Sequence, residues 1–370
     1  MADVLFVSKP VEPPWNDSSK NLVRDLAGAM VRHRPIVMTS RDAPPTALGL
    51  AKIEALYSPR DMGHASGLSD QARVLGRLLL GRSGDIVHYF FAPNRRTSSV
   101  ARGVTWARRR PTIQTVCSAP AVGEHLRQIL FADRSVVLST HTEQRFLAAG
   151  VAADRLLLIP PCIPPLPMPS PASQRATRKR HGLDGERPLL VYPGDLEFSK
   201  GADRCLEVLA DLPKEPGATL AVCARFKTPA ARNRLAELRA TAKRLKVEGR
   251  VRFLGEISDI HDVLATADVV LLPAENLYAK MDLPLVLLEA MCQARVVVVL
   301  RGTAAEELAH DGAAYAVTAD REALCAQIAR LLDDGNLRTT VGEKARARVL
   351  DHYSPLSMAA AYEALYDTLL

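Results

Sequence analysis

Short apolar runs alternate with helix-length amphipathic segments along the whole chain, and this alternation constrains the fold more than any other feature. The alternation is typical of parallel β-sheets that are flanked by helices. The pattern predicts strands at residues 4–7, 36–38, 86–91, 112–116, 136–138 and 156–159, and then at 189–192, 219–223, 251–254, 269–272 and 296–300. It predicts helices at residues 19–32, 70–80, 98–107, 143–149, 202–210, 229–245, 284–293, 321–332 and 336–350. We therefore expect an α/β fold with two doubly wound domains and a ligand in a cleft between them, at the carboxyl ends of the strands.

A proline-rich segment interrupts the alternation near the middle of the chain. Seven of the twelve residues from 160 to 171 are proline, which sustains neither a helix nor a central strand. At 370 residues the chain is also longer than one hydrophobic core usually organises. We predict a first domain over residues 1–165 and a second that begins at 166.

The positive charge is concentrated in the first domain. Residues 1–165 hold 21 Lys and Arg against 13 Asp and Glu, whereas residues 166–370 hold 27 against 28, so the net charges are +8 and −1. This excess suits an anionic partner, such as a phospholipid headgroup or a lipid-diphosphate acceptor, or it is an ordinary solvated face. No nucleic-acid-binding motif accompanies the arginines, so no nucleic acid is expected as a partner.

Other sequence features narrow the class of protein. No apolar run approaches the roughly 20 residues that span a bilayer, and the first residues read as a strand rather than a signal peptide. We expect a cytoplasmic protein with peripheral contact at the inner face of the membrane. The six cysteines form no CxxC pair and no cluster of acids suggests a metal, so neither a metal nor a cofactor is expected.

The first chemically informative segment leads from a strand through a glycine turn to a lysine at the start of a helix. It contains Gly194, Asp195, Lys200 and Gly201. A helix amino terminus carries free N–H groups and partial positive charge, so a lysine beside it favours an anion such as phosphate. A glycine turn followed by Lys-Gly is also common where a chain simply turns between two elements. A purely structural role therefore stays open.

A second segment places two acids around a helix start. Asp282 precedes Pro284, where it would cap the helix or complement its dipole, and Glu289 lies in an otherwise apolar stretch. A carboxylate there needs partners, which are either ligand hydroxyls or a neighbouring arginine.

Taken in order, these segments resemble the nucleotide-sugar half of GT-B glycosyltransferases of family 4, the glycosyl transferases group 1. The resemblance covers most of residues 186–320. It rests on Lys200-Gly201, residues 251–255, residues 267–269, residues 285–291, and Gly302 with Glu306. It implies two Rossmann-like domains facing a cleft, with an acceptor domain over 1–165 and a nucleotide-sugar donor domain over 166–352. It also implies that residues 353–370 form a terminal helix that crosses back to the first domain.

The resemblance assigns roles to particular residues. Lys200 would contact the donor diphosphate, and Glu289, the second acid of the family's Glu-x7-Glu motif, would bind the ribose hydroxyls. Glu306 lies at the acid of the downstream glycine-rich loop. The expected catalytic residues are Lys200, Asp282 and Glu289, and the expected donor-binding residues are Gly194, Asp195, Lys200, Arg225, Lys227, Asp282, Leu285, Glu289 and Glu306.

The chain departs from the family pattern at the expected diphosphate. Met281 stands where the first glutamate should contact the transferred sugar, and Asp282 replaces it only if the backbone shifts. Asp195 replaces the usual arginine, and Pro284 replaces a glycine and removes a backbone donor. Arg225 and Lys227 are the candidates to restore the lost positive charge, although they also suit an exposed basic loop.

On the acceptor side, Asn16, Asp17 and Ser18 lie in the loop before the first predicted helix. Asp17 or Ser18 also suits the N-cap of that helix. His88, His125 and His141 are the histidines of this half that could carry a proton, or they are ordinary core and surface residues.

The leading hypothesis is a glycosyltransferase that moves a sugar from a nucleotide-sugar donor to a hydroxyl of a glycan, lipid or small-molecule acceptor. Retention of the anomeric configuration is implied by the family alone. The alternatives are a GT-B protein that binds a nucleotide sugar or a partner without transfer, and a GT-B sugar-nucleotide epimerase.

Overall fold

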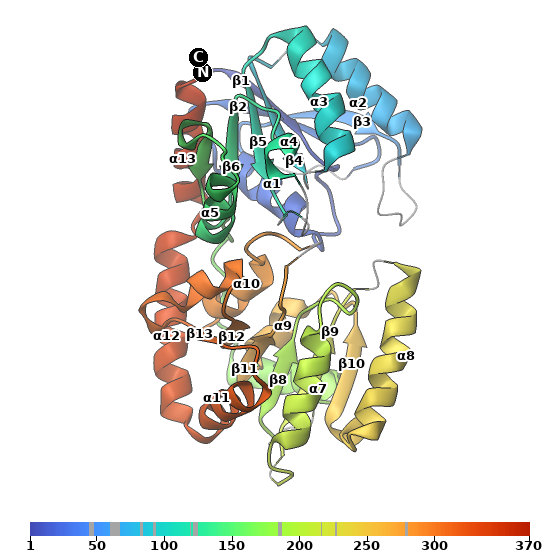
Figure 1. Cartoon of the computed structure of the whole chain (residues 1–370), viewed down its shortest axis with the longest axis vertical. Coiled ribbons are helices and arrows are strands. Elements are labelled where there is room, and N and C mark those ends of the chain that lie inside the picture. The colour runs from blue at the N-terminus through green and yellow to red at the C-terminus, as the bar shows by residue number, and fades with distance from the viewer. Residues whose placement is uncertain are drawn as a thin grey trace. The chain divides into compact units, whose positions relative to one another are not determined.

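The computed structural model describes residues 1–43, 48–59, 67–81, 84–91, 94–118, 120, 125–183, 187–215, 217–225, 228–277 and 280–370. The chain forms two compact units (Figure 1). The first unit comprises Met1–Pro164, Tyr278–Leu283 and Tyr353–Leu370. The second comprises Pro165–Leu277 and Pro284–His352. The chain therefore leaves the second unit at residue 278, enters the first and returns at 284, an excursion that the sequence pattern did not predict.

The first unit is built on a parallel sheet with seven strands in its described part, in the order β3-β2-β1-β4-β5-β6-β7. Its strands are β1 Asp3–Val7, β2 Arg34–Ser40, β3 Lys52–Tyr57, β4 Ile86–Phe91, β5 Thr112–Val116, β6 Arg134–Val137 and β7 Leu156–Leu158. Its helices are α1 Ser18–Ala29, α2 Leu68–Leu80, α3 Arg95–Arg108, α4 Leu126–Ile129, α5 Thr140–Ala148 and α13 Pro355–Asp367, with a 3₁₀ turn η1 at Ala153–Arg155.

Strand β3 was not predicted, because three of its six residues are exposed and only Tyr57 is buried. It pairs in parallel with β2 at the edge of the sheet, where Ile36 lies opposite Lys52. An edge strand with one solvated side alternates weakly, so a search for apolar runs passes over it.

The second unit is built on a parallel sheet with six strands in its described part, in the order β10-β9-β8-β11-β12-β13. Its strands are β8 Leu189–Tyr192, β9 Thr219–Cys223, β10 Val251–Gly255, β11 Val269–Leu272, β12 Val296–Leu300 and β13 Tyr315–Val317. Its helices are α6 Pro171–Arg180, α7 Gly201–Asp211, α8 Pro229–Arg244, α9 Ile260–Ala265, α10 Leu285–Cys292, α11 Arg321–Asp333 and α12 Gly335–His352, with 3₁₀ segments η2 Glu248–Arg250 and η3 Ala304–Gly312. The short elements β13, α6 and α9 were not predicted.

Helix α13 packs on the first unit through specific polar bonds. The Glu363 side chain is 2% exposed and accepts hydrogen bonds from the backbone N–H groups of Val31 and His33 at 2.9 and 3.1 Å. Tyr362 and Tyr366 of the same helix are fully buried. The terminal segment is thus an integral part of the first unit, and its helix is packed against α1.

Candidate functional site

The strand order of the second unit reverses between β8 and β11. From β8 the chain moves outward to β9 and β10, and it then returns to place β11 on the other side of β8. In doubly wound sheets, loops that leave the carboxyl ends of two such strands diverge and open a ligand site. The loops after β8 and β11 contain the residues that the sequence selected for the donor.

The loop after β8 is shaped by the packing of Tyr192. A Cβ atom on Gly194 would lie 2.0 Å from Cζ of Tyr192, and one on Gly201 would lie 2.8 Å from its hydroxyl oxygen. The Tyr192 hydroxyl donates to the carbonyl of Asp195 at 2.8 Å, and burial raises the pKa of this phenol. The two glycines are therefore required so that the loop can fold over the buried ring.

Asp195 folds the loop rather than facing a ligand. Its side chain is buried, and Oδ1 accepts from the backbone N–H groups of Glu197 and Phe198 at 3.0 and 2.6 Å. Such a turn is a common use of aspartate. Where the family has an arginine, this chain thus has an acid that stabilises a turn. Asp195 brings no positive charge to the donor side.

Lys200 lies at the N-cap position of α7, as the sequence predicted. Its side chain is exposed, and no hydrogen bond or ion pair of its ammonium group is recorded within the described ranges. The first N–H groups of α7 have no partner within the helix. An exposed ammonium beside these N–H groups is an arrangement that binds phosphate oxygens.

Arg204, one turn further along α7, connects the two diverging loops. Its guanidinium donates to the carbonyl of Pro273 at 3.3 Å and pairs with the carboxylate of Glu275 in the segment after β11. The sequence gave no signal for this pair, because the partners are 71 residues apart. The pair fixes the spacing of the two loops at the carboxyl edge of the sheet.

Helix α10 begins beside this edge, with Pro284 at its N-cap. Leu285 is 1% exposed, so its side chain is part of the core. Glu289 is partly buried, and its carboxylate lies 3.3 Å from Nε2 of His261 on α9. This histidine was missed by the sequence analysis, which expected either ligand hydroxyls or an arginine as the partner of Glu289.

The remaining donor-side residues occupy neighbouring loops. Glu306 accepts from the backbone N–H of Gly302 at 2.7 Å and so closes the turn after β12, where Gly302 has a φ of +77°. Arg225 is half-buried and follows the carboxyl end of β9. Lys227 lies outside the described residues.

Asp282 does not cap α10, and this expectation was wrong. It is fully buried in the first unit, where its two carboxylate oxygens accept from the hydroxyls of Ser139 and Thr142, each at 2.6 Å. Its backbone N–H donates to the carbonyl of Cys117 at 3.0 Å, and Met281 bridges Ser118. Burial raises the pKa of the Asp282 carboxyl, and the two hydroxyl bonds oppose the shift. Both carboxylate oxygens of Asp282 are thus hydrogen-bonded within the first unit.

The acceptor-side candidates separate into a surface group and a core residue. Asp17 is the N-cap of α1, accepts from the backbone N–H of Ser19 at 3.0 Å and pairs with Lys9 at 2.7 Å. Asn16 is exposed beside it, and Ser18 is the first residue of the helix. These residues lie in the loop after β1, at the carboxyl edge of the first sheet.

His88 lies in the core instead of facing an acceptor, so its assignment to the acceptor side is corrected. It is 0% exposed, with Nδ1 2.7 Å from the Tyr366 hydroxyl and Nε2 2.7 Å from the Thr115 hydroxyl. Burial lowers the pKa of its imidazole well below the usual value. An imidazole that is buried in the core, with both nitrogens hydrogen-bonded, is not placed to take a proton from a substrate hydroxyl.

Two kinds of feature are absent from the described residues, a metal-binding cluster and a membrane-spanning helix. No group of three or more His, Cys, Asp or Glu side chains in those ranges is arranged to hold a metal ion. Among the described helices, none has the length and apolarity that crossing a membrane requires.

Part of the second unit is similar to a known protein family. Residues 173–348 match the family described as glycosyl transferases group 1. We call this stretch the group 1 region. The group 1 region includes Lys200, Arg225, Glu289 and Glu306, so the motifs that suggested the family lie inside the match.

Curated proteins also match the chain over part of its length. The chain is 26% identical over 198 residues to N-acetyl-alpha-D-glucosaminyl L-malate synthase of Bacillus anthracis, a match that covers 52% of this chain and 49% of the relative. It is 31% identical over 164 residues to D-inositol 3-phosphate glycosyltransferase of Xylanimonas cellulosilytica, which covers 42% and 38%. The chain thus matches about half or less of the length of these relatives.

The structure also resembles a solved structure over its full length. HepE of Anabaena, solved in complex with UDP and glucose, has a TM-score of 0.80 at 19% identity, with 100% of both chains covered. At this identity the likeness concerns the fold. The two parallel-sheet units are the two Rossmann-like domains of a GT-B protein, which confirms the predicted fold class.

Proposed function

We propose that this chain is a glycosyltransferase that moves a sugar from a nucleotide-sugar donor to a hydroxyl of a glycan, lipid or small-molecule acceptor, with retention of the anomeric configuration. The observation that carries the proposal is Lys200. It lies exposed at the start of α7, at the point where the sheet of the group 1 region changes direction. Second-unit residues would bind the donor, and the loop after β1 in the first unit would meet the acceptor.

The proposed chemistry depends on the leaving group. When the bond from the sugar to the diphosphate breaks, negative charge accumulates on the diphosphate oxygens. The ammonium of Lys200 and the backbone N–H groups of the first turn of α7 would stabilise that charge, and the helix holds these N–H groups in place before the reaction. Arg225, after the neighbouring strand β9, would add a second cation. Glu289, oriented by His261, would accept hydrogen bonds from the ribose hydroxyls.

Two residues that the sequence placed in this machinery receive other roles. Asp282 is bonded to Ser139 and Thr142, and Asp195 holds the turn after β8. The proposed transfer therefore uses neither of them on the sugar. At the position of the first glutamate of the family motif, this chain has Met281, which is not acidic.

The experiment that tests the proposal measures release of the nucleoside diphosphate from a panel of nucleotide sugars. UDP-sugars come first, because HepE was solved with UDP-glucose. Release that requires an added acceptor hydroxyl supports a transferase. Calorimetric binding without release would support a non-transferring binding protein, and release without any acceptor would support an epimerase-like reaction.

A specific surface feature favours a second proposal, contact of the first unit with an anionic membrane. On α3, Trp106 and Val100 are 79% and 59% exposed, and they share the helix with Arg95, Arg96 and Arg102. Exposed aromatic and apolar side chains beside arginines suit the interface of an anionic bilayer. Sedimentation with vesicles of phosphatidylglycerol and phosphatidylcholine tests this. We expect binding that weakens in Trp106→Ala and at high salt, and equal recovery with purely neutral vesicles would contradict it.

A further inference from the structure

A pocket opens at the amino-terminal end of strands in the second unit, away from the loops that carry Lys200 and Gly302. Its volume is about 640 Å³, and it lies where β11 and β12 begin. One side of α12 forms a wall of it. The residues that line it are Met168, Asp268, Ala294, Arg295, Val296, Gly335, Arg338, Thr339, Glu343, Arg346, Ala347 and Leu350.

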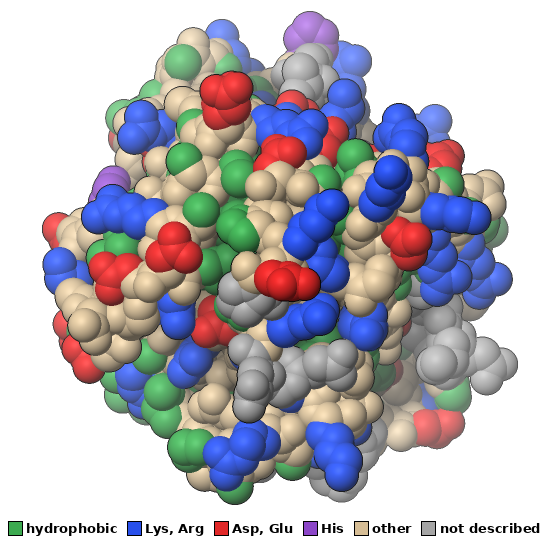
Figure 2. Space-filling view, turned by 90° about the horizontal axis from the view of Figure 1, so that it is seen from below, with side chains coloured by type: hydrophobic (Ala, Val, Ile, Leu, Met, Phe, Trp, Pro, Cys, Tyr) green, Lys and Arg blue, Asp and Glu red, His purple; other side chains and the backbone are tan. Residues whose placement is uncertain are grey.

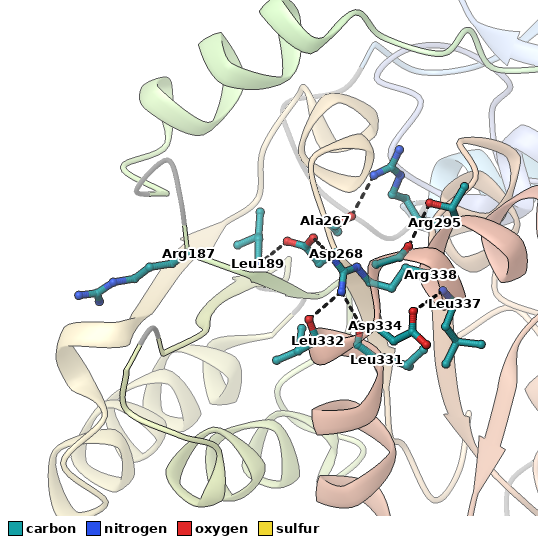
Figure 3. A network of polar contacts seen from close by, with 12 residues as sticks. Arg187, Leu189, Ala267, Asp268, Arg295, Leu331, Leu332, Asp334, Leu337 and Arg338 are labelled. Carbon is teal, nitrogen blue, oxygen red and sulfur yellow. Dashed lines mark hydrogen bonds and ion pairs between the residues drawn. The ribbon is translucent and has the colours of Figure 1, made fainter.

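Three arginines of this pocket are held by backbone carbonyls. Arg338 donates through Nη1 to the carbonyls of Leu331 and Leu332 at 2.6 and 2.8 Å (Figure 3). Arg295 donates through Nε to Gln293 at 3.0 Å and through Nη1 to Ala267 at 3.2 Å. Arg346 donates through Nη1 to the carbonyls of Leu166, at 3.3 Å, and Cys292.

These carbonyl bonds use only part of each guanidinium. Within the part of the chain that the structure describes, no bond is recorded for Nη2 of Arg295 or for Nε and Nη2 of Arg346. A guanidinium that is already fixed loses little conformational entropy when its remaining N–H groups bind a ligand. The arginines are thus prepared to bind an anion.

The charge balance of the pocket is positive. Asp268 accepts from the backbone N–H of Leu189 at 2.8 Å and from Arg178 at 3.1 Å, and its other oxygen lies 3.5 Å from Nη2 of Arg338. Three guanidiniums and two carboxylates line the pocket, and Arg178 adds a fourth cation to the same Asp268. Burial lowers the pKa of Arg295, and the charges of Arg178 and Arg338 contribute to this shift. An anion would relieve the repulsion among these cations.

The other lining residues fit a ligand with a carbon skeleton and hydroxyls. Met168 and Leu350, 46% and 39% exposed, present apolar surface at the pocket. Glu343 is exposed on α12 and is able to accept hydrogen bonds from hydroxyl groups. A pocket of this size holds a small metabolite, and arginine forks match phosphate oxygens. Figure 2 views the molecule from below Figure 1 and shows Lys and Arg side chains gathered across the middle of that face.

We propose that this pocket, which we call the α12 pocket, is a binding site for a phosphorylated small molecule of sugar-phosphate size, separate from the donor site. The phosphate would lie against Arg295, Arg338 and Arg346, and the hydroxyls would face Glu343. Arg295 and Arg346 are bonded to carbonyls at the end of α10, the helix that carries Glu289. A ligand in the α12 pocket is therefore in physical contact with residues that hold one element of the donor site.

The test is a calorimetric titration of the full chain with glucose 6-phosphate, with glucose as the uncharged comparison. We expect glucose 6-phosphate to bind with a Kd below about 1 mM and glucose to show no binding. Ala347→Glu adds an acid to the lining without removing any arginine, and it should weaken the binding at least tenfold. Ala240→Glu, at an exposed position of α8, is the matched control and should bind as the unmodified chain does.

A further variant separates the α12 pocket from the donor site, because Lys200 is also prepared for phosphate. Lys200→Ala should leave the affinity for glucose 6-phosphate within about twofold. Loss of binding in Lys200→Ala with retention in Ala347→Glu would overturn the proposal, and so would equal affinity of the unmodified chain for glucose and glucose 6-phosphate. Circular dichroism of each variant confirms that it is folded.

Discussion

Two polar residues of the first unit and two of the second lie in opposite environments. In the first unit, His88 and Asp282 are fully buried and all their polar side-chain atoms are bonded to neighbouring side chains. In the second unit, Lys200 is exposed, and Glu289 keeps partial exposure beside His261. Residues of similar chemistry thus stabilise the fold in one unit and remain accessible to a ligand in the other.

This difference shows what decides between a structural and a functional polar residue. A polar group that leaves water must find a partner within the protein, and once its donors or acceptors are occupied it has little to offer a substrate. The exposed ammonium of Lys200 has no such hydrogen-bond partner among the described residues, so it remains available to a ligand. The comparison predicts that substitutions in the two units will separate into effects on stability and effects on turnover.

The largest expected effect is on turnover, from Lys200→Ala. Removal of one fixed donor to a developing negative charge costs about 100-fold to 1,000-fold in kcat. Thermal unfolding should be unchanged, because Lys200 is exposed. Steady-state release of nucleoside diphosphate provides the measurement, and Lys214→Ala, an exposed lysine before β9, is the matched control. Activity within about twofold of the unmodified chain would remove Lys200 from the account.

A smaller effect, on stability, is expected for Asp282→Ala. The change leaves the buried hydroxyls of Ser139 and Thr142 without their acceptor, which should cost about 2 kcal/mol of unfolding free energy. Urea denaturation measures the change, with Asp154→Ala as the exposed control in the same unit. The affinity for the nucleotide sugar should stay within about twofold. A tenfold loss of affinity with unchanged stability would return Asp282 to the sugar-binding residues.

Glu289→Gln should weaken donor binding by about tenfold, or about 1.4 kcal/mol, because a hydrogen bond from a ribose hydroxyl to a charged acceptor is stronger than one to an amide. Calorimetry with UDP and with uracil provides the measurement, since only UDP carries the ribose and the diphosphate. His261→Gln should show a smaller loss, because it alters only the orientation of Glu289. Unchanged UDP affinity in Glu289→Gln would contradict the ribose assignment.

A pH dependence of stability originates in His88. Because burial lowers the pKa of the folded-state imidazole, the unfolded chain binds more protons at mildly acidic pH. This histidine therefore removes stability as the pH falls below about 6.5, by up to about 1.4 kcal/mol per pH unit. Urea unfolding of the unmodified chain and of His88→Gln at pH 5, 6 and 7 isolates the contribution. Identical slopes in the two proteins would show that the buried ring does not titrate this way.

Much of the fold was readable from the sequence because buried parallel strands are continuous apolar runs. The runs at 269–272 and 296–300 became β11 and β12 at the predicted residues. Strand β3 was missed because it is a half-exposed edge, and β13 because it is short and none of its three residues is fully buried. Local spacing carries no information on either kind of element.

The candidate site was only partly predictable, and for a different reason. The position of Lys200 at a helix start depends on nearby residues, so the glycine turn predicted it. The partners of Glu289 and Asp282 are 28 and 140 or more residues distant in sequence, and long-range pairs of this kind leave no periodic signal. The arginines of the α12 pocket likewise come from separate segments that meet only in the folded unit.

The most direct test of the central claim is a crystal structure of the full chain with UDP bound. The account predicts that the diphosphate lies at the start of α7, with a phosphate oxygen within about 3.2 Å of Nζ of Lys200, and that the ribose hydroxyls face Glu289. A diphosphate bound elsewhere on the second unit, with Lys200 and Glu289 making no contact to the nucleotide, would contradict it.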